Sequence, residues 1–172
     1  MILQDGDAKV ELNIIGYMFP QLEDKRWDSD WLIIQLNLDL PIGNWGRSDS
    51  CITTFEVARL IGWLEEVYKK FEVFEDWHSG RLEAQINFTE PSLEFEVHSN
   101  HSGYRRDPNV YLRVYFAVEF LPPFKDQMRP YLNPEDVDNV YLDFSITPAQ
   151  ILEIIESLRS QLEQFPVRVG LP

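Results

Sequence analysis

The side chains with the most reactive chemistry in this chain are three histidines and one cysteine. His98 and His101 have the spacing H-x-x-H, whereas His78 lies apart from them. A zinc ion takes three or four nitrogen, sulfur or oxygen ligands, so two histidines would have to converge with a carboxylate. His98 stands at the end of a predicted strand and His101 in a polar loop, where a histidine is ordinarily solvated. We therefore expect no metal site.

The single cysteine, Cys51, precedes the first predicted helix, where the helix dipole favours a thiolate. A nucleophile also needs a base within reach, and the sequence contains no Cys–His family signature. A small buried thiol is the interpretation we favour. One cysteine also excludes an intramolecular disulfide, which fits a reducing compartment.

Paired carboxylates offer a second kind of chemistry. Asp28 and Asp30 lie beside Trp27 and Trp31, an arrangement suited to acid–base catalysis or sugar binding. The alternative is an acidic loop that two tryptophans anchor to the core. Phosphate-binding, dinucleotide-binding, zinc-protease and nucleophile-elbow motifs do not occur. We expect a protein that is not an enzyme and needs no cofactor, with a small hydrolase as the less favoured alternative.

Charge narrows the choice of partner. The 172 residues include 29 Asp and Glu but only 15 Lys and Arg, a formal net charge of −14. Such a surface favours basic partners and disfavours nucleic acid and anionic membranes, although charge also keeps proteins soluble. We expect no direct nucleic-acid or membrane binding. Three acidic clusters are candidates for binding a basic partner, with a solvated surface as the alternative: Glu23, Asp24, Asp28 and Asp30; Glu65, Glu66, Glu72, Glu75 and Asp76; and Glu135, Asp136, Asp138 and Asp143.

Most of the chain has strand periodicity. Six segments alternate apolar and polar residues with period two, which indicates strands that bury one face and expose the other. They are residues 10–14, 32–40, 82–88, 93–97, 110–120 and 140–146. Glu90-Pro91-Ser92 predicts a hairpin turn between the third and fourth. We expect an antiparallel sheet of about six strands.

Two segments have helical periodicity instead, with apolar stripes from Val57 to Phe71 and from Ile151 to Phe165. Each begins with a capping-box sequence, Thr53 with Glu56 and Thr147 with Gln150, and on the first helix Glu65–Lys69 and Glu66–Lys70 have the i, i+4 spacing of ion pairs. The predicted fold is α+β in the order ββαββββα, with both helices on the apolar face of the sheet. Residues 1–172 are expected to form a single domain.

The polar side of the two last predicted strands is unusual. Tyr111, Arg113 and Tyr115 alternate with the apolar row of one strand, and Tyr141 and Asp143 with that of the next. If these strands are neighbours, an aromatic and charged patch lies on the open sheet face. Tyr and Arg are enriched at interaction hot spots. The alternative is that a helix or loop covers this face.

Several motifs together resemble the WapI family of bacterial immunity proteins over residues 10–72 and again at Phe165-Pro166. They are Gly16-Tyr17-Met18-Phe19-Pro20, Trp27-Asp28-Ser29-Asp30-Trp31-Leu32, Gly43-Asn44-Trp45, Asp49-Ser50-Cys51-Ile52-Thr53-Thr54-Phe55-Glu56 and Trp63-Leu64. The resemblance implies a small cytoplasmic protein that protects the cell from the C-terminal domain of a WapA-like contact-dependent toxin, a nuclease acting on tRNA. The start of the chain, without a basic region or a long apolar run, is consistent with that location.

The functional hypothesis is an immunity protein that binds and neutralises a basic toxin domain by stoichiometric, partly electrostatic blocking. A non-enzymatic acidic adaptor is the alternative. We expect a monomer or weak homodimer. The acidic clusters and the aromatic patch supply the expected toxin-binding residues: Asp28, Asp30, Glu65, Glu66, Glu72, Glu75, Asp76, Tyr111, Arg113, Tyr115, Glu135, Asp136, Asp138 and Tyr141.

Overall fold

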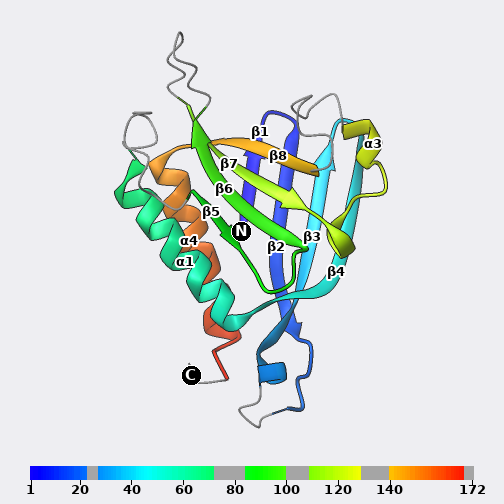
Figure 1. Cartoon of the computed structure of the whole chain (residues 1–172), viewed down its shortest axis with the longest axis vertical. Coiled ribbons are helices and arrows are strands. Elements are labelled where there is room, and N and C mark those ends of the chain that lie inside the picture. Colours follow the sequence, from blue (N-terminus) through cyan, green and yellow to red (C-terminus); the bar gives the residue numbers. More distant parts are fainter. Residues whose placement is uncertain (23–26, 72–83, 100–108, 129–139, 169–172) are drawn as a thin grey trace.

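The computed structural model of the chain describes residues 1–22, 27–71, 84–99, 109–128 and 140–168 (Figure 1). Within them the strands form two four-stranded antiparallel sheets, sheet A in the order β1-β2-β3-β4 and sheet B in the order β5-β6-β7-β8. The elements are β1 (Ile2–Asp5), β2 (Ala8–Tyr17), η1 (Trp27–Asp30), β3 (Trp31–Leu40), β4 (Gly43–Thr53), α1 (Thr54–Lys69), β5 (Gln85–Asn87), β6 (Leu93–Ser99), β7 (Val110–Phe116), η3 (Val118–Phe120), α3 (Lys125–Met128), β8 (Val140–Ile146) and α4 (Pro148–Gln164).

The α+β class is confirmed, but the single sheet of about six strands is wrong. The prediction missed β1 and β4. Four residues are too few to display a period, and in β1 only Leu3 is buried. β4 lies at the edge of sheet A, where most of its length is exposed or half-buried, so the segment from Asn44 to Ser50 is polar and shows no alternation.

Two predicted strands have other limits in the structure. The strand expected over residues 82–88 is described only as β5 (Gln85–Asn87), and residues 82 and 83 lie outside the described part. The strand expected to reach residue 120 ends at Phe116. Val118 takes a positive φ of 49° and begins the short helix η3, so its side chain is exposed rather than part of the apolar row.

Both long helices begin as their sequences predict. At the start of α1 the Glu56 amide donates to Thr53 Oγ1 (3.2 Å) and the Thr53 amide donates to the Glu56 carboxylate (3.0 Å). Thr147 and Gln150 make the same reciprocal bonds at the start of α4, with Pro148 in its first turn. Each box satisfies backbone donors that the helix itself leaves unpaired.

The core lies between the sheets and the helices. Sheet B lies in front of sheet A in Figure 1, and α1 and α4 run side by side along one side of both sheets. The inward rows of both sheets and the stripes of both helices form one connected cluster of buried side chains. β1 also approaches β8, where the Ser145 amide donates to Asp5 Oδ2 (3.1 Å). In the described residues no helix has the length and hydrophobicity to cross a membrane.

Candidate functional site

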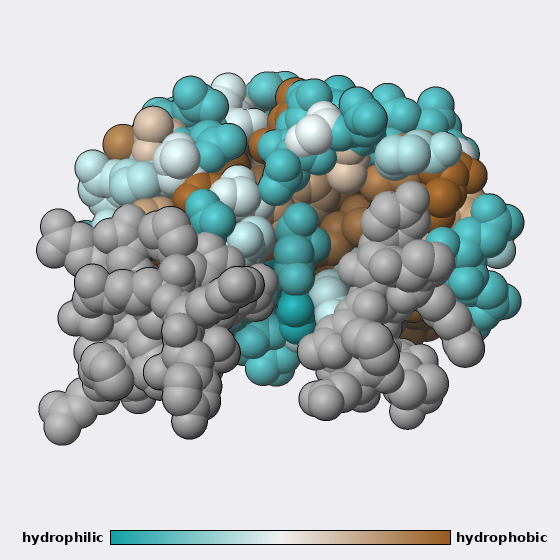
Figure 2. Space-filling model, turned by 90° about the horizontal axis from the view of Figure 1, so that it is seen from above, coloured by the Kyte–Doolittle hydropathy of each residue, from teal (hydrophilic) through white to brown (hydrophobic). Residues whose placement is uncertain are grey.

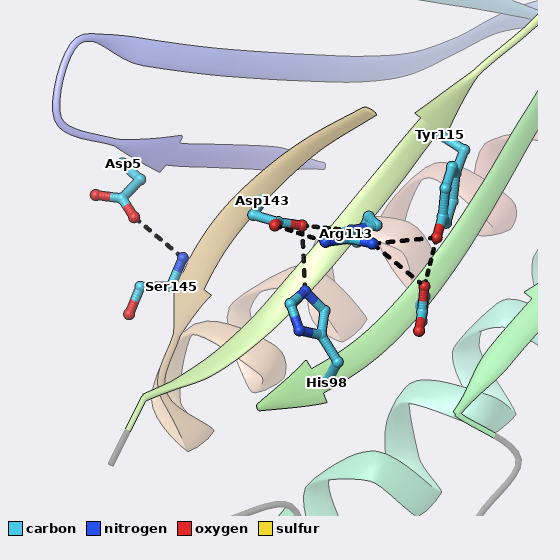
Figure 3. A network of polar contacts seen from close by, with 7 residues as sticks. Asp5, His98, Arg113, Tyr115, Asp143 and Ser145 are labelled. Atoms are coloured by element: carbon cyan, nitrogen blue, oxygen red, sulfur yellow. Dashed lines mark hydrogen bonds and ion pairs between the residues drawn. The ribbon is translucent and has the colours of Figure 1, made fainter. Parts of the chain in front are cut away.

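The structure makes β7 and β8 neighbours, which brings the predicted aromatic and charged residues together. Arg113 is opposite Asp143 and Tyr115 is opposite Tyr141, on the face of sheet B that points away from the core. On the other side of β7, β6 places Glu96 opposite Arg113 and His98 opposite Tyr111. We call Glu96, His98, Tyr111, Arg113, Tyr115, Tyr141 and Asp143 the Arg113 network. Figure 3 shows His98, Arg113, Tyr115 and Asp143 of this network.

Arg113 is the centre of this network. Its Nε and Nη2 donate to the two oxygens of Asp143, at 2.7 and 2.9 Å, in a bidentate pair. Its guanidinium carbon lies 3.7 Å from the centroid of the Tyr141 ring, within the range of a cation–π contact. The Arg113 side chain is only 15% exposed, so these contacts form in partly desolvated surroundings.

The network extends to β6 on both sides of Arg113. His98 Nε2 lies 3.2 Å from Asp143 Oδ1, and its ring stacks on Tyr111 with 5.5 Å between centroids. The Tyr115 hydroxyl donates to Glu96 Oε2 (2.5 Å) and accepts from Arg113 Nη1 (3.4 Å). Sequence reasoning missed Glu96 and His98 as members, although both alternate with the apolar row of their strand and that alternation was a usable signal.

Asp143 and Tyr115 of the network each keep one protonation state near neutrality, because their pKa values lie far from 7. Burial opposes ionisation of Asp143, but hydrogen bonds from Arg113 and His98 outweigh it and lower the Asp143 pKa to about 2. Burial raises the pKa of Tyr115 to about 12, with the Glu96 hydrogen bond acting in the same direction. Asp143 is therefore ionised and Tyr115 neutral at pH 7. Two side chains that keep their protonation states suit rigid recognition of a partner better than proton transfer.

A polar hollow of about 330 Å³ adjoins this network beside Tyr115. Glu94 lies in its wall, and the pKa of Glu94 is raised by burial and by the charge of Glu96. Its other lining residues are Gln85, Pro91, Phe116, Ala117 and Val140. The outer face of sheet B is thus uneven and carries aromatic rings, a held arginine and carboxylates.

The carboxylates of η1 do not join this face. Asp30 is 4% exposed, and its Oδ1 accepts the backbone N–H of Arg168 at 2.7 Å. The Arg168 guanidinium in turn stacks on Tyr17 and donates to the carbonyl oxygen of Phe19. Asp30 therefore ties the end of the chain to the loop before β3, while Asp28 in the same turn is exposed. The structural interpretation of this acidic loop explains Asp30 without a catalytic role.

The acidic residues of α1 also lie apart from the Arg113 network. Glu66 pairs with Lys69 (2.9 Å) and with Lys70 (3.4 Å), the latter as the sequence predicts. The predicted pair of Glu65 with Lys69 is wrong, because Glu65 accepts from Arg159 of α4 instead. A neighbouring helix competed for this carboxylate, and local spacing does not reveal that.

The remaining predicted residues lie outside the described part of the structure. They are Glu72, Glu75, Asp76, Glu135, Asp136 and Asp138 among the expected toxin-binding residues, with Glu23, Asp24, His78 and His101. Among the described residues, no three His, Cys, Asp or Glu side chains are grouped to hold a metal ion. Cys51 is fully buried, and burial raises the pKa of its thiol well above the usual range. The favoured interpretation of Cys51 as a buried thiol is confirmed.

Comparison with known proteins identifies relatives at the level of the family. A family model described as the Immunity protein WapI-like family matches residues 1–166. The match extends far beyond residues 10–72 and includes both sheets and both long helices. A search of curated proteins found no match.

Proposed function

Since the chain belongs to the WapI-like immunity protein family, we propose that it neutralises a cognate toxin domain by binding it one to one in the cytoplasm. The family match is the observation that carries this proposal. Binding requires no turnover and no cofactor, which agrees with the buried Cys51 thiol and with an Asp143 carboxylate that stays ionised at neutral pH.

The charge of the chain supports a nuclease as the toxin. A nuclease domain needs a basic surface to hold its polyanionic substrate, and a partner with net charge −14 complements that surface. Covering the substrate surface would block the toxin without any contact to its catalytic atoms.

Within this proposal, the outer face of sheet B is the docking surface. Tyr and Arg are among the residue types that dominate binding energy. The accessible rings of this face are the half-buried Tyr111 and Tyr115, since Tyr141 is only 2% exposed and packs against Arg113. The Arg113 network already holds Arg113 in place. A rigid surface loses little side-chain entropy on binding, so more of the contact energy remains as affinity.

The test of function is co-expression with the toxin domain encoded immediately upstream of this gene. We expect restored growth and a co-purifying one-to-one complex, measured by light scattering after gel filtration. Toxicity that persists while the protein is folded and abundant would contradict the proposal.

A separate pair of variants tests whether the outer face of sheet B is the docking surface. Tyr111→Ala removes a half-buried ring from the Arg113 network and should weaken toxin binding about tenfold or more. Tyr68→Ala removes an exposed ring from α1 and should leave the affinity within about twofold, as expected for a residue outside the interface. Calorimetric titration of both variants measures the difference. Equal affinities would remove this face from the interface.

A further inference from the structure

A second hollow, largely apolar, opens where the two sheets end near α3. Its volume is about 290 Å³, and its apolar walls come from Ala8, Leu40, Pro41, Ile42, Met128 and Leu142. These residues belong to the start of β2, the end of β3, the turn between β3 and β4, α3 and β8. Figure 2 looks onto this end of the molecule and shows hydrophobic surface between hydrophilic residues. A hollow of this size, near the low end of small-molecule sites at about 300 Å³, suits one large side chain.

The charged residues that line this hollow are both acidic. Asp5 and Asp7 lie in its wall, and no lysine or arginine does. Asp5 uses Oδ2 to accept the Ser145 amide, which holds its carboxylate in place. Within the residues that the structure describes, the exposed Asp7 carboxylate makes no hydrogen bond or ion pair, so its charge is available to a partner.

Asp5 connects the hollow to β8. It lines the hollow and accepts the amide of Ser145, which lies two residues after Asp143 and therefore on the same face of sheet B. Figure 3 shows Asp5 and Ser145 beside the Arg113 network. The hollow therefore lies near the outer face of sheet B, on the side of β8.

We propose that this hollow receives a hydrophobic side chain of the cognate toxin domain, with a neighbouring lysine or arginine of the toxin paired to Asp5 and Asp7. The inference rests on the proposed function. It names a contact that would make toxin binding specific. Charge complementarity selects the occupant, because an apolar anchor beside a basic side chain fits a nuclease surface better than a second copy of this acidic chain.

The experiment measures toxin affinity for three full-length variants. Asp7→Asn removes a negative charge without removing a bond to any residue that the structure describes. Ile42→Ser removes part of the apolar wall at a half-buried turn. Glu163→Gln is the matched control, an exposed carboxylate in the last turn of α4, whose end lies at the opposite end of the molecule. We expect Kd to rise about tenfold for Ile42→Ser, about fivefold for Asp7→Asn and less than about twofold for Glu163→Gln. Thermal unfolding of each variant confirms that it is folded.

The affinity measurements separate a failure of the hollow proposal from a failure of the proposed function. If the unchanged protein binds the toxin and both hollow variants keep its affinity, the hollow proposal is wrong and the proposed function stands. If the unchanged protein neither binds nor protects, the proposed function itself fails. Dimerisation of the free chain that Ile42→Ser abolishes would also overturn the proposal, since the hollow would then hold a second copy of this chain.

Discussion

Arg113 joins the three longer strands of sheet B on the face away from the core. It contacts Asp143 of β8 and Tyr115 of its own strand, and its Nη1 lies 3.9 Å from Glu96 of β6. Because the side chain is largely desolvated, these contacts count for more than a surface ion pair. At the scale of single residues, this network determines the shape and charge of the candidate docking face.

Removing Arg113 should therefore cost stability as well as binding. Arg113→Ala leaves the Asp143 carboxylate partly buried without its bidentate partner, and we expect a loss of about 2 kcal/mol in the free energy of unfolding. Arg47→Ala is the control, because Arg47 pairs with Asp49 (2.8 Å) on the exposed strand β4 and should cost less than about 1 kcal/mol. Urea denaturation measures both. Equal losses would show that the network is no stronger than a surface pair.

Asp143 should also make stability depend on pH. Its pKa falls from 3.8 to about 2 on folding, so its contribution is complete above pH 4 and is lost as the pH falls towards 2. After allowance for solvent screening we expect about 1 kcal/mol from this residue. The free energy of unfolding, measured from pH 5 to pH 2, should fall less steeply for Asp143→Asn than for the unchanged protein. Parallel curves would contradict the assignment.

At the scale of elements, Glu56 connects α1 to sheet B. One oxygen of its buried carboxylate closes the capping box on Thr53, and the other accepts the amide (2.6 Å) and the hydroxyl (2.7 Å) of Thr89, in the turn after β5. A residue that sequence identifies only as a helix cap therefore also fixes the hairpin of β5 and β6 against the helix.

The two capping boxes should differ in strength for this reason. Glu56→Ala leaves donors of the buried Thr53 unsatisfied and also removes both bonds to the exposed Thr89, and we expect a loss of about 2 kcal/mol. Gln150→Ala breaks an exposed box on α4 and should cost about 1 kcal/mol or less. Thermal unfolding of the two variants compares them directly. A smaller loss for Glu56→Ala than for Gln150→Ala would rule out the link to Thr89.

At the scale of the whole molecule, charge should act on the rate at which the toxin is captured. A protein of net charge −14 attracts a basic domain over distances that salt screens, about 10 Å at 0.1 M. We expect the association rate to fall about tenfold or more between 50 mM and 500 mM salt, while the dissociation rate changes little. Stopped-flow or surface-based kinetics measures both rates. An association rate that ignores salt would reject the electrostatic part of the proposal.

The sequence by itself determined the α+β class, both capped helices, the strands other than β1 and β4, and the family. These features depend on periodicity and capping, which involve residues close together in the chain. The same period also placed Tyr111, Arg113 and Tyr115 on the polar side of one strand. That the 172 residues act as one domain stays a prediction.

Only the tertiary structure decided how these elements divide and pair. It separated one expected sheet into two, recruited the polar edge strand β4, and set the register that places Asp143 against Arg113. It also paired the buried Asp30 with the backbone N–H of Arg168, and Glu65 with Arg159 of α4. Apart from β4, which pairs with the preceding strand β3, these outcomes join residues far apart in sequence. Their partners are selected by the packing of the whole molecule, and no local pattern of residues encodes that selection.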